Sequence, residues 1–277
     1  MELFVILAYC SADDAIKKNG LIDNVQTRVS AAQILTTIIV AARFYGANHK
    51  QAQDFLFEHR YFDHKLSRSQ FCRRLHAIPD DVFTELQALF ASYAKSLNES
   101  YEFAIDSFPV PACDNIRIQR SRLFDPKKCR GFIASKRRYF HGVRVHVIAT
   151  HNRLVVDFVI LDGATSDIQG AKKLAFDLPA ESTVYADKAY SDYKYEDTLL
   201  QTKNIHLEPI RKKNLRRQRS EQEEKTIKSR RRPIETLFSV ITRWMPKTIH
   251  AVTPKGFIKK LKCFLFAHSI ESLMVTT

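Results

Sequence analysis

Cysteine, glycine and long apolar runs are all scarce in this chain of 277 residues. Its five cysteines are odd in number and widely spaced, and no Cys-x-x-Cys pair occurs, so neither a disulfide framework nor a cysteine zinc site is expected. With only seven glycines and nine prolines, the chain is not of low complexity. No apolar run is long enough to span a membrane, and the short apolar start lacks the basic residues of a signal peptide. We therefore expect a protein of the reducing cytoplasm that has no membrane partner.

Basic residues outnumber acidic ones, and the excess is concentrated in two segments. Lys and Arg number 44 against 30 Asp and Glu, which gives a net charge of +14. Residues 117–144 hold ten basic residues and one acid, and residues 211–232 hold eleven basic residues and three acids. Charge that serves only solubility usually mixes both signs. The two segments therefore indicate a localised binding face for a polyanion such as nucleic acid.

Residues 1–98 are predicted to form a domain of helices. Within it, Ser67 is a suitable N-cap for a helix that turns Phe71 and Leu75 inward. The polar residues of this helix are then available for phosphates or base edges, namely Arg68, Ser69, Gln70, Arg73 and Arg74. This pattern is typical of the recognition helix of a helix-turn-helix-like module, but it fits a solvated basic helix equally well.

Beyond residue 98 the apolar residues change from a helical period to that of strands. The predicted order is strands at 101–110, 139–150 and 154–161, a helix at 167–176, a strand at 182–187, a helix at 193–202 and a strand at 205–210. This is the order of an RNase H-like core, an α+β fold with a mixed five-stranded sheet and flanking helices. Residues 99–277, including the C-terminal helices, are assigned to this domain. The first and fourth strands of that fold lie side by side.

Three acidic residues lie where such a fold would bring them together. Asp106 is near the end of the first strand, among apolar residues, where an unpaired carboxylate costs several kcal/mol. A turn at the strand end is the commoner explanation for such an Asp, and a metal ion is the other. Asp187 ends the fourth strand, and Glu235 lies at the front of an apolar-periodic helix. Two carboxylates at strand ends and one on a helix make a set of hard oxygens suited to Mg²⁺ or Mn²⁺.

The second basic segment, residues 211–232, contains almost no apolar residues except Leu215 and Ile227. We expect it to be a flexible connector, or one that DNA orders, because it cannot bury enough surface to fold alone. Pro233 is expected at the first position of the next helix, where its missing N–H costs nothing. Glu235 would then fall in the first turn, where the helix dipole favours a negative charge.

Several long strings in the chain resemble the DDE transposases of bacterial insertion sequences, and most of all the family named after insertion sequence nine-eight-two. The similar strings are SRSQFCRRLHAI, IDSFPVPACDNIRI, RGFIASKRRYFHG, VYADKAYSDY, PIRKKN, RRPIETLFSVIT and IHAVTPKGF, between about residues 67 and 260. The resemblance implies an RNase H-like catalytic domain whose triad is Asp106, Asp187 and Glu235. Neighbouring families carry a Tyr-x₂-Arg-x₃-Glu-x₆-Lys signature, of which this chain keeps Arg231 but has Lys228 and Thr242 at the Tyr and Lys positions.

The resemblance also implies the reaction, its cofactor and its partners. The expected activity is cleavage and transfer of DNA strands at two Mg²⁺ ions, with Mn²⁺ as a substitute. DNA, as element terminal repeats and as target, is the expected partner of a nucleoid-associated homodimer or higher oligomer. Residues expected to hold DNA are Arg68, Gln70, Arg73, Arg74, Lys136, Arg137, Arg138, Arg211, Lys212, Lys213 and Arg231.

Other functions stay open at this point. An RNase H-like nuclease would share the three acids but has little need of a helical DNA reader. A DNA-binding protein derived from a transposase would be favoured by loss of a triad residue, and a structural RNA binder leaves the acids unexplained. His141 and His146 could support the metal ligands, but a core or surface role is commoner for such histidines.

Overall fold

The computed structural model describes residues 1–276 except 114, 122, 134–136 and 212–215. The chain divides into two compact units, one formed by Met1–Phe90 with Val240–Thr277 and the other by Ala91–Ser239. The C-terminal helix therefore groups with the N-terminal helices, whereas the sequence pattern placed it in the catalytic domain.

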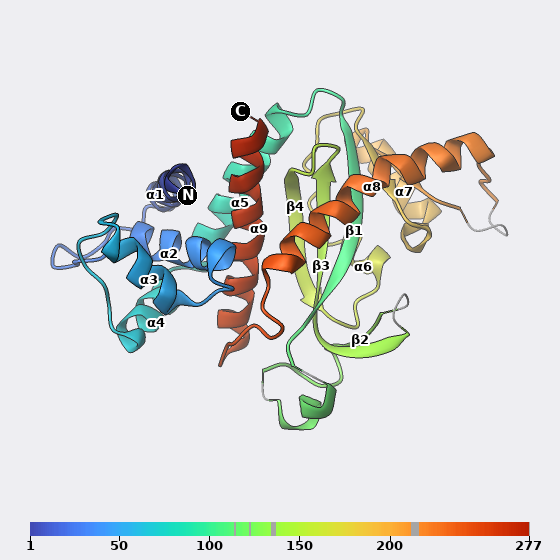
Figure 1. Ribbon diagram of the computed structural model, residues 1–277. Coiled ribbons are helices and arrows are strands. Elements are labelled where there is room, and N and C mark those ends of the chain that lie inside the picture. Colours follow the sequence, from blue (N-terminus) through green and yellow to red (C-terminus); the bar gives the residue numbers. More distant parts are fainter. Residues whose placement is uncertain (114, 122, 134–136, 212–215, 277) are drawn as a thin grey trace. The chain divides into compact units, whose positions relative to one another are not determined.

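The first unit is built of helices around α2 (Ala31–Phe44), which is buried on almost all sides. Its neighbours are α1 (Glu2–Asn19), α3 (His49–Glu58), α4 (Arg68–Ala77) and α9 (Pro254–Thr276), and most of α5 (Asp80–Ser96) belongs to the same unit (Figure 1). Ser30 begins α2 with a capping box, in which the Gln33 side chain accepts from Ser30 N at 2.8 Å. No helix in the described ranges is both long and apolar enough to cross a membrane.

The predicted helix after Ser67 forms as α4, with Phe71 and Leu75 buried. However, residues 59–67 separate α3 from α4, which is longer than the roughly three- to four-residue turn of a helix-turn-helix. The helix-turn-helix prediction is therefore not confirmed, and α4 remains a basic helix packed on a helical core.

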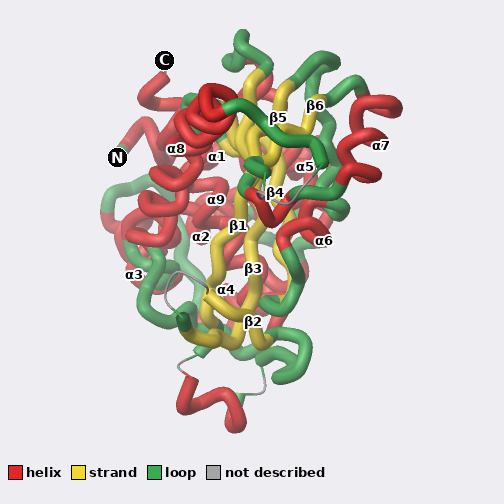
Figure 2. Tube along the Cα trace, turned by 90° about the vertical axis from the view of Figure 1, so that its right-hand side faces the viewer, coloured by secondary structure: helices red, strands yellow, loops and turns green. Residues whose placement is uncertain are grey.

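The second unit contains a mixed six-stranded sheet (Figure 2). Its strands are β1 (Glu102–Pro111), β2 (Arg130–Ile133), β3 (Arg138–Thr150), β4 (Val155–Asp162), β5 (Thr183–Ala186) and β6 (His206–Pro209). β1 is the central strand, and it runs antiparallel to β3 and parallel to β5. Both β2 and β4 pair with β3. On the other side, β6 pairs with β5. The sequence pattern missed only the short strand β2, which lies in the first basic segment.

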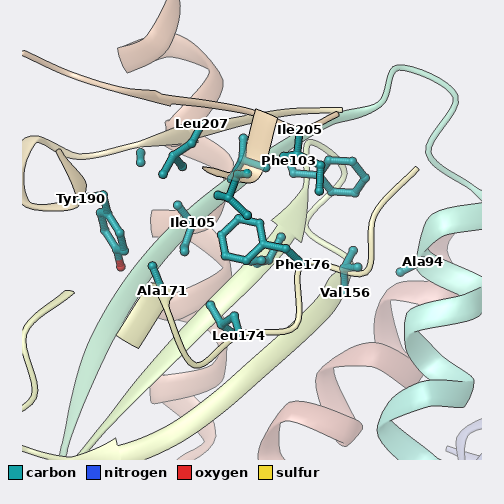
Figure 3. Packing of buried hydrophobic residues seen from close by; sticks show 14 of the residues in the cluster. Ala94, Phe103, Ile105, Val156, Ala171, Leu174, Phe176, Tyr190, Ile205 and Leu207 are labelled. Atoms are coloured by element: carbon teal, nitrogen blue, oxygen red, sulfur yellow. The ribbon is translucent and has the colours of Figure 1, made fainter. Parts of the chain in front are cut away.

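Side chains of β1 alternate between two environments, as the pleat of a strand requires. Phe103 and Ile105 pack into a core with residues such as Tyr190, which follows β5, and Leu199 of α7 (Tyr193–Lys203) (Figure 3). Even-numbered residues face α8 (Glu221–Trp244) instead, and the ring of Phe108 lies 4.7 Å from that of Phe238. Asp106 therefore faces α8, and its neighbour Ser107 faces the opposite side.

α8 is a single helix that includes half of the expected connector, so the prediction that a helix begins at Pro233 is wrong. The helix begins after Ser220, whose N–H donates to Glu223 Oε2 at 2.7 Å in a capping box. Ion pairs one turn apart, such as Glu221–Lys225 at 2.7 Å, and burial of Ile227 support the extension. Pro233 consequently lies inside the helix, and Glu235 is not in its first turn.

Candidate active site

β1 and β5 bring Asp106 and Asp187 to the same part of the sheet. The parallel ladder pairs Ala104 with Tyr185, and the same register continued by two residues sets Asp106 beside Asp187. Asp106 is still within β1, whereas Asp187 follows β5 and accepts a hydrogen bond from Lys188 N at 2.7 Å. The adjacency expected from the strand order is therefore present.

The guanidinium of Arg231 lies between these two carboxylates. Its Nη2 donates to Asp106 Oδ2 at 2.9 Å, and its Nη1 is 3.8 Å from Asp187 Oδ1. The Arg231 side chain is only 10% exposed, and its buried Nε has no hydrogen-bond partner in the described part of the chain. α8 thus delivers one positive charge to a pair of negative charges on the sheet.

Burial has the largest effect on the pKa of Asp106. It raises the pKa of this carboxyl to about 6, although Arg231 and the N–H of Ser107, which donates at 2.8 Å, both act to lower it. The nearby charges of Asp167 and Asp187 raise the pKa further. Asp106 is therefore a poorly solvated carboxylate that a cation would stabilise.

A second polar network lies on the opposite side of β1, and the sequence pattern did not indicate it. Ser107 Oγ donates to Asp167 Oδ1 at 2.5 Å and accepts from Arg144 Nη1 at 3.2 Å. Asp167 opens the short helix α6 (Asp167–Ala171), and burial raises the pKa of Tyr190 well above its usual value, with Asp106 and Asp167 adding to the rise. Only the alternation of β1, which turns Ser107 away from α8, could have suggested a polar contact here.

Glu235 lies one helical turn beyond Arg231 on α8, about 40° around the helix from it, and is exposed. Within the described ranges, no three His, Cys, Asp or Glu side chains are close enough together to hold a metal ion. The two aspartates nevertheless suit Mg²⁺ or Mn²⁺ in kind, because their hard oxygens converge on a cation, here the guanidinium of Arg231.

The residues predicted to hold DNA are dispersed, and several are already engaged. On α4, Gln70 caps the helix start at Ser67, and Arg74 pairs with Asp23 at 2.6 Å, while Arg68 and Arg73 are exposed. Arg137 and Arg138 are exposed, and Lys136, Lys212 and Lys213 lie outside the described residues.

Arg211, His141 and His146 are buried inside the second unit. Both nitrogens of the Arg211 fork bond to Glu196, at 2.8 and 2.5 Å, and the two side chains are 3% and 7% exposed. His141 and His146 are fully buried on β3, and neither ring nitrogen of His146 has a hydrogen-bond partner among the described residues. Arg211 therefore does not present its charge to a ligand here.

Comparison with known proteins gives one match. Residues 97–251, more than half of the chain, match the family model described as Transposase DDE domain. The match covers the whole sheet, both aspartates and Glu235. No curated protein and no solved structure is detectably similar to the chain.

Proposed function

The chain belongs to the Transposase DDE domain family, and on this premise we propose that it is an insertion-sequence transposase of the nine-eight-two family. It would bind the ends of its element, cleave DNA strands there and join them to target DNA. Pairing two element ends usually takes at least two copies of the chain, so we propose a homodimer or higher oligomer on DNA, associated with the nucleoid.

The observation that carries this proposal is the convergence of Asp106 and Asp187 on the Arg231 guanidinium. We assign Asp106 and Asp187 as catalytic metal ligands, and Glu235 as the third. The position of Glu235 beside Arg231 on α8 supports this, because a rotation or shift of that helix segment would turn its carboxylate towards the same place. The sheet, its strand order and its flanking helices support an RNase H-like core.

Two Mg²⁺ ions, or Mn²⁺ in their place, would supply an activated water at neutral pH and stabilise charge on the scissile phosphate. The chain's own residues would hold and orient these groups. Asp106 is fixed by β1 and by the Ser107 N–H, so it offers its Oδ2 in one direction only. Arg231, displaced from the two aspartates, would bond a DNA phosphate, because its planar fork suits phosphate oxygens.

The test is nicking of a duplex that carries the element end, in the presence of Mg²⁺. Asp106→Asn, Asp187→Asn and Glu235→Gln are each expected to abolish nicking, with DNA binding nearly intact. Glu221→Gln is the matched control, since it makes the same change on the same helix at an exposed residue whose one ion pair within the described ranges is with Lys225. Full nicking by any of the three variants would refute the assignment of that residue.

Strand transfer distinguishes a transposase from a nuclease of the same fold. If the wild-type protein nicks DNA but never joins the freed 3′ end to a second duplex, the transfer half of the proposal fails. If it binds DNA and does not nick it under any divalent cation, a DNA-binding role remains.

A further inference from the structure

A large groove lies within the first, helical unit. Its volume is about 1120 Å³, and its walls come from the first turns of α3 and α9, from most of α4 and from residues 250–253. This volume exceeds the roughly 300–1,000 Å³ of most small-molecule sites. The groove therefore suits a segment of a polymer better than a single small ligand.

The groove is strongly basic. Lys50, Lys65, Arg68 and Lys260 line it, and Asp54 is the only acid among the lining residues. Lys65 pairs with Asp54 at 2.9 Å, which neutralises that acid. In the part of the chain that the structure describes, no ion pair involves the other three cations. They leave an uncompensated positive charge along the groove.

Three helices also point their N-termini at this groove. Asn48 caps α3, Ser67 caps α4 and Thr253 caps α9, each by accepting the N–H of the residue three positions on. All three caps line the groove. The first turn of a helix carries free N–H groups and the positive end of its dipole, so each start adds to the attraction for an anion.

One buried ring nitrogen beside the groove has no partner among the residues that the structure describes. The Nε2 of His49 is buried without a hydrogen bond among the described residues, and His49 lines the groove beside Lys260. Burial, helped by Lys260, lowers the pKa of His49 to about 3, so the ring is neutral and can donate one hydrogen bond.

We propose that this groove binds the phosphodiester backbone of DNA without reading its sequence. That the ligand is DNA rests on the proposed function. The groove, and not the outer face of α4, would then be the main DNA contact of this unit. Two residues of that outer face, Gln70 and Arg74, are held by Ser67 and Asp23. The cations of the groove have the chemistry of backbone contacts, which position DNA rather than specify a sequence.

The first test compares two changes on one helix. Arg68→Gln removes a groove cation, and Arg73→Gln removes an exposed cation of α4 that lies outside the groove. Arg68→Gln and Lys50→Gln should each weaken binding of the full chain about tenfold, equally for an element-end duplex and a scrambled duplex. The salt slope of each should flatten by about 0.9, and Arg73→Gln should keep the wild-type values. Wild-type affinity in both groove variants would overturn the proposal.

The second test uses two native cysteines and needs no variant. Cys72 is exposed and lines the groove, whereas Cys10 is exposed on α1 outside it. Saturating DNA should slow alkylation of Cys72 about tenfold, measured by mass spectrometry, and leave Cys10 unchanged. Unchanged alkylation of Cys72 with DNA bound, or protection by polyglutamate and not by DNA, would place another ligand in the groove. If the wild-type chain bound neither duplex, the proposed function itself would fail, and the groove assignment with it.

Discussion

At the scale of single residues, Arg231 occupies the place between Asp106 and Asp187 that a cation favours. It should therefore compete with a divalent metal ion when DNA is absent. Arg231→Gln is expected to tighten Mn²⁺ binding by about tenfold, or about 1.4 kcal/mol, in calorimetric titration of the DNA-free protein. The titration should be run well above pH 6, because loss of the guanidinium raises the pKa of Asp106 further.

The neighbouring Arg230 provides the control for this titration. It lies on the same helix but pairs with Glu102 at 3.1 Å and not with either aspartate. Arg230→Gln should leave Mn²⁺ affinity unchanged. Equal effects of the two variants would mean that Arg231 acts only through the general charge of α8.

Asp106 and His146 make opposite contributions to the pH dependence of stability. Burial raises the pKa of Asp106 from 3.8 to about 6, so the folded state binds this proton more tightly, and its contribution is lost as pH rises through 6. Burial lowers the pKa of His146 from 6.5 to about 4, so stability is lost as pH falls from 6.5 towards 4. Each of these two effects is worth about 3 kcal/mol, so they offset one another between pH 4 and 6, and the low pKa of His49 adds a further loss of stability on acidification.

Variants should separate the two contributions. Asp106→Asn should make the free energy of unfolding fall more steeply between pH 6 and 4 than in the wild type, because the opposing gain from Asp106 is removed. His146→Leu should make that fall shallower than in the wild type, because one of the two histidine contributions is removed. Urea unfolding at several pH values measures both slopes, and parallel curves for the two variants and the wild type would contradict the assignment.

At the scale of elements, local signals were sufficient where they act within a few residues. The cap at Ser67 predicted the start of α4, and the apolar period of residues 139–150 predicted the strand β3. The strand order then predicted that Asp106 and Asp187 meet. What could not be predicted were pairings between distant residues, such as Arg231 with Asp106 and Ser107 with Asp167. Nothing in the sequence fixes which of many arginines and acids will meet.

At the start of the second basic segment, the acidic partner of each arginine decides whether its charge is buried or exposed. Arg211 is buried with Glu196, whereas Arg217, six residues on, makes an exposed pair with Asp197. Arg211→Ala should destabilise the protein by about 3–5 kcal/mol, because it leaves the Glu196 carboxylate buried and unpaired. Arg217→Ala should change the free energy of unfolding little, because solvent screens an exposed pair. Similar urea midpoints for the two variants would mean that Arg211 is free to bind DNA after all.

At the scale of the whole molecule, the two ends of the chain build one helical unit. α9 packs on α2 through a buried face that includes Phe264, and the ring of Phe266 lies 5.8 Å from that of Phe90. The buried Lys259 Nζ donates to Leu75 O at 3.1 Å and to Ile78 O at 2.6 Å, which fixes the end of α4 to α9. The helical domain suggested by the sequence, residues 1–98, therefore lacks part of its own core.

We expect a fragment of residues 1–98 to be helical by far-ultraviolet circular dichroism but to lack a cooperative unfolding transition, since its core is incomplete. Residues 1–90 joined to 240–277 through a glycine-serine linker should unfold cooperatively and should bind DNA, because Lys260 and Thr253 complete the groove. The linked fragment carrying Arg68→Gln is the control for binding through that groove. A cooperative transition in residues 1–98 alone would show that α9 is not part of this core, and DNA binding by that fragment would place the DNA contact on α4 without α9.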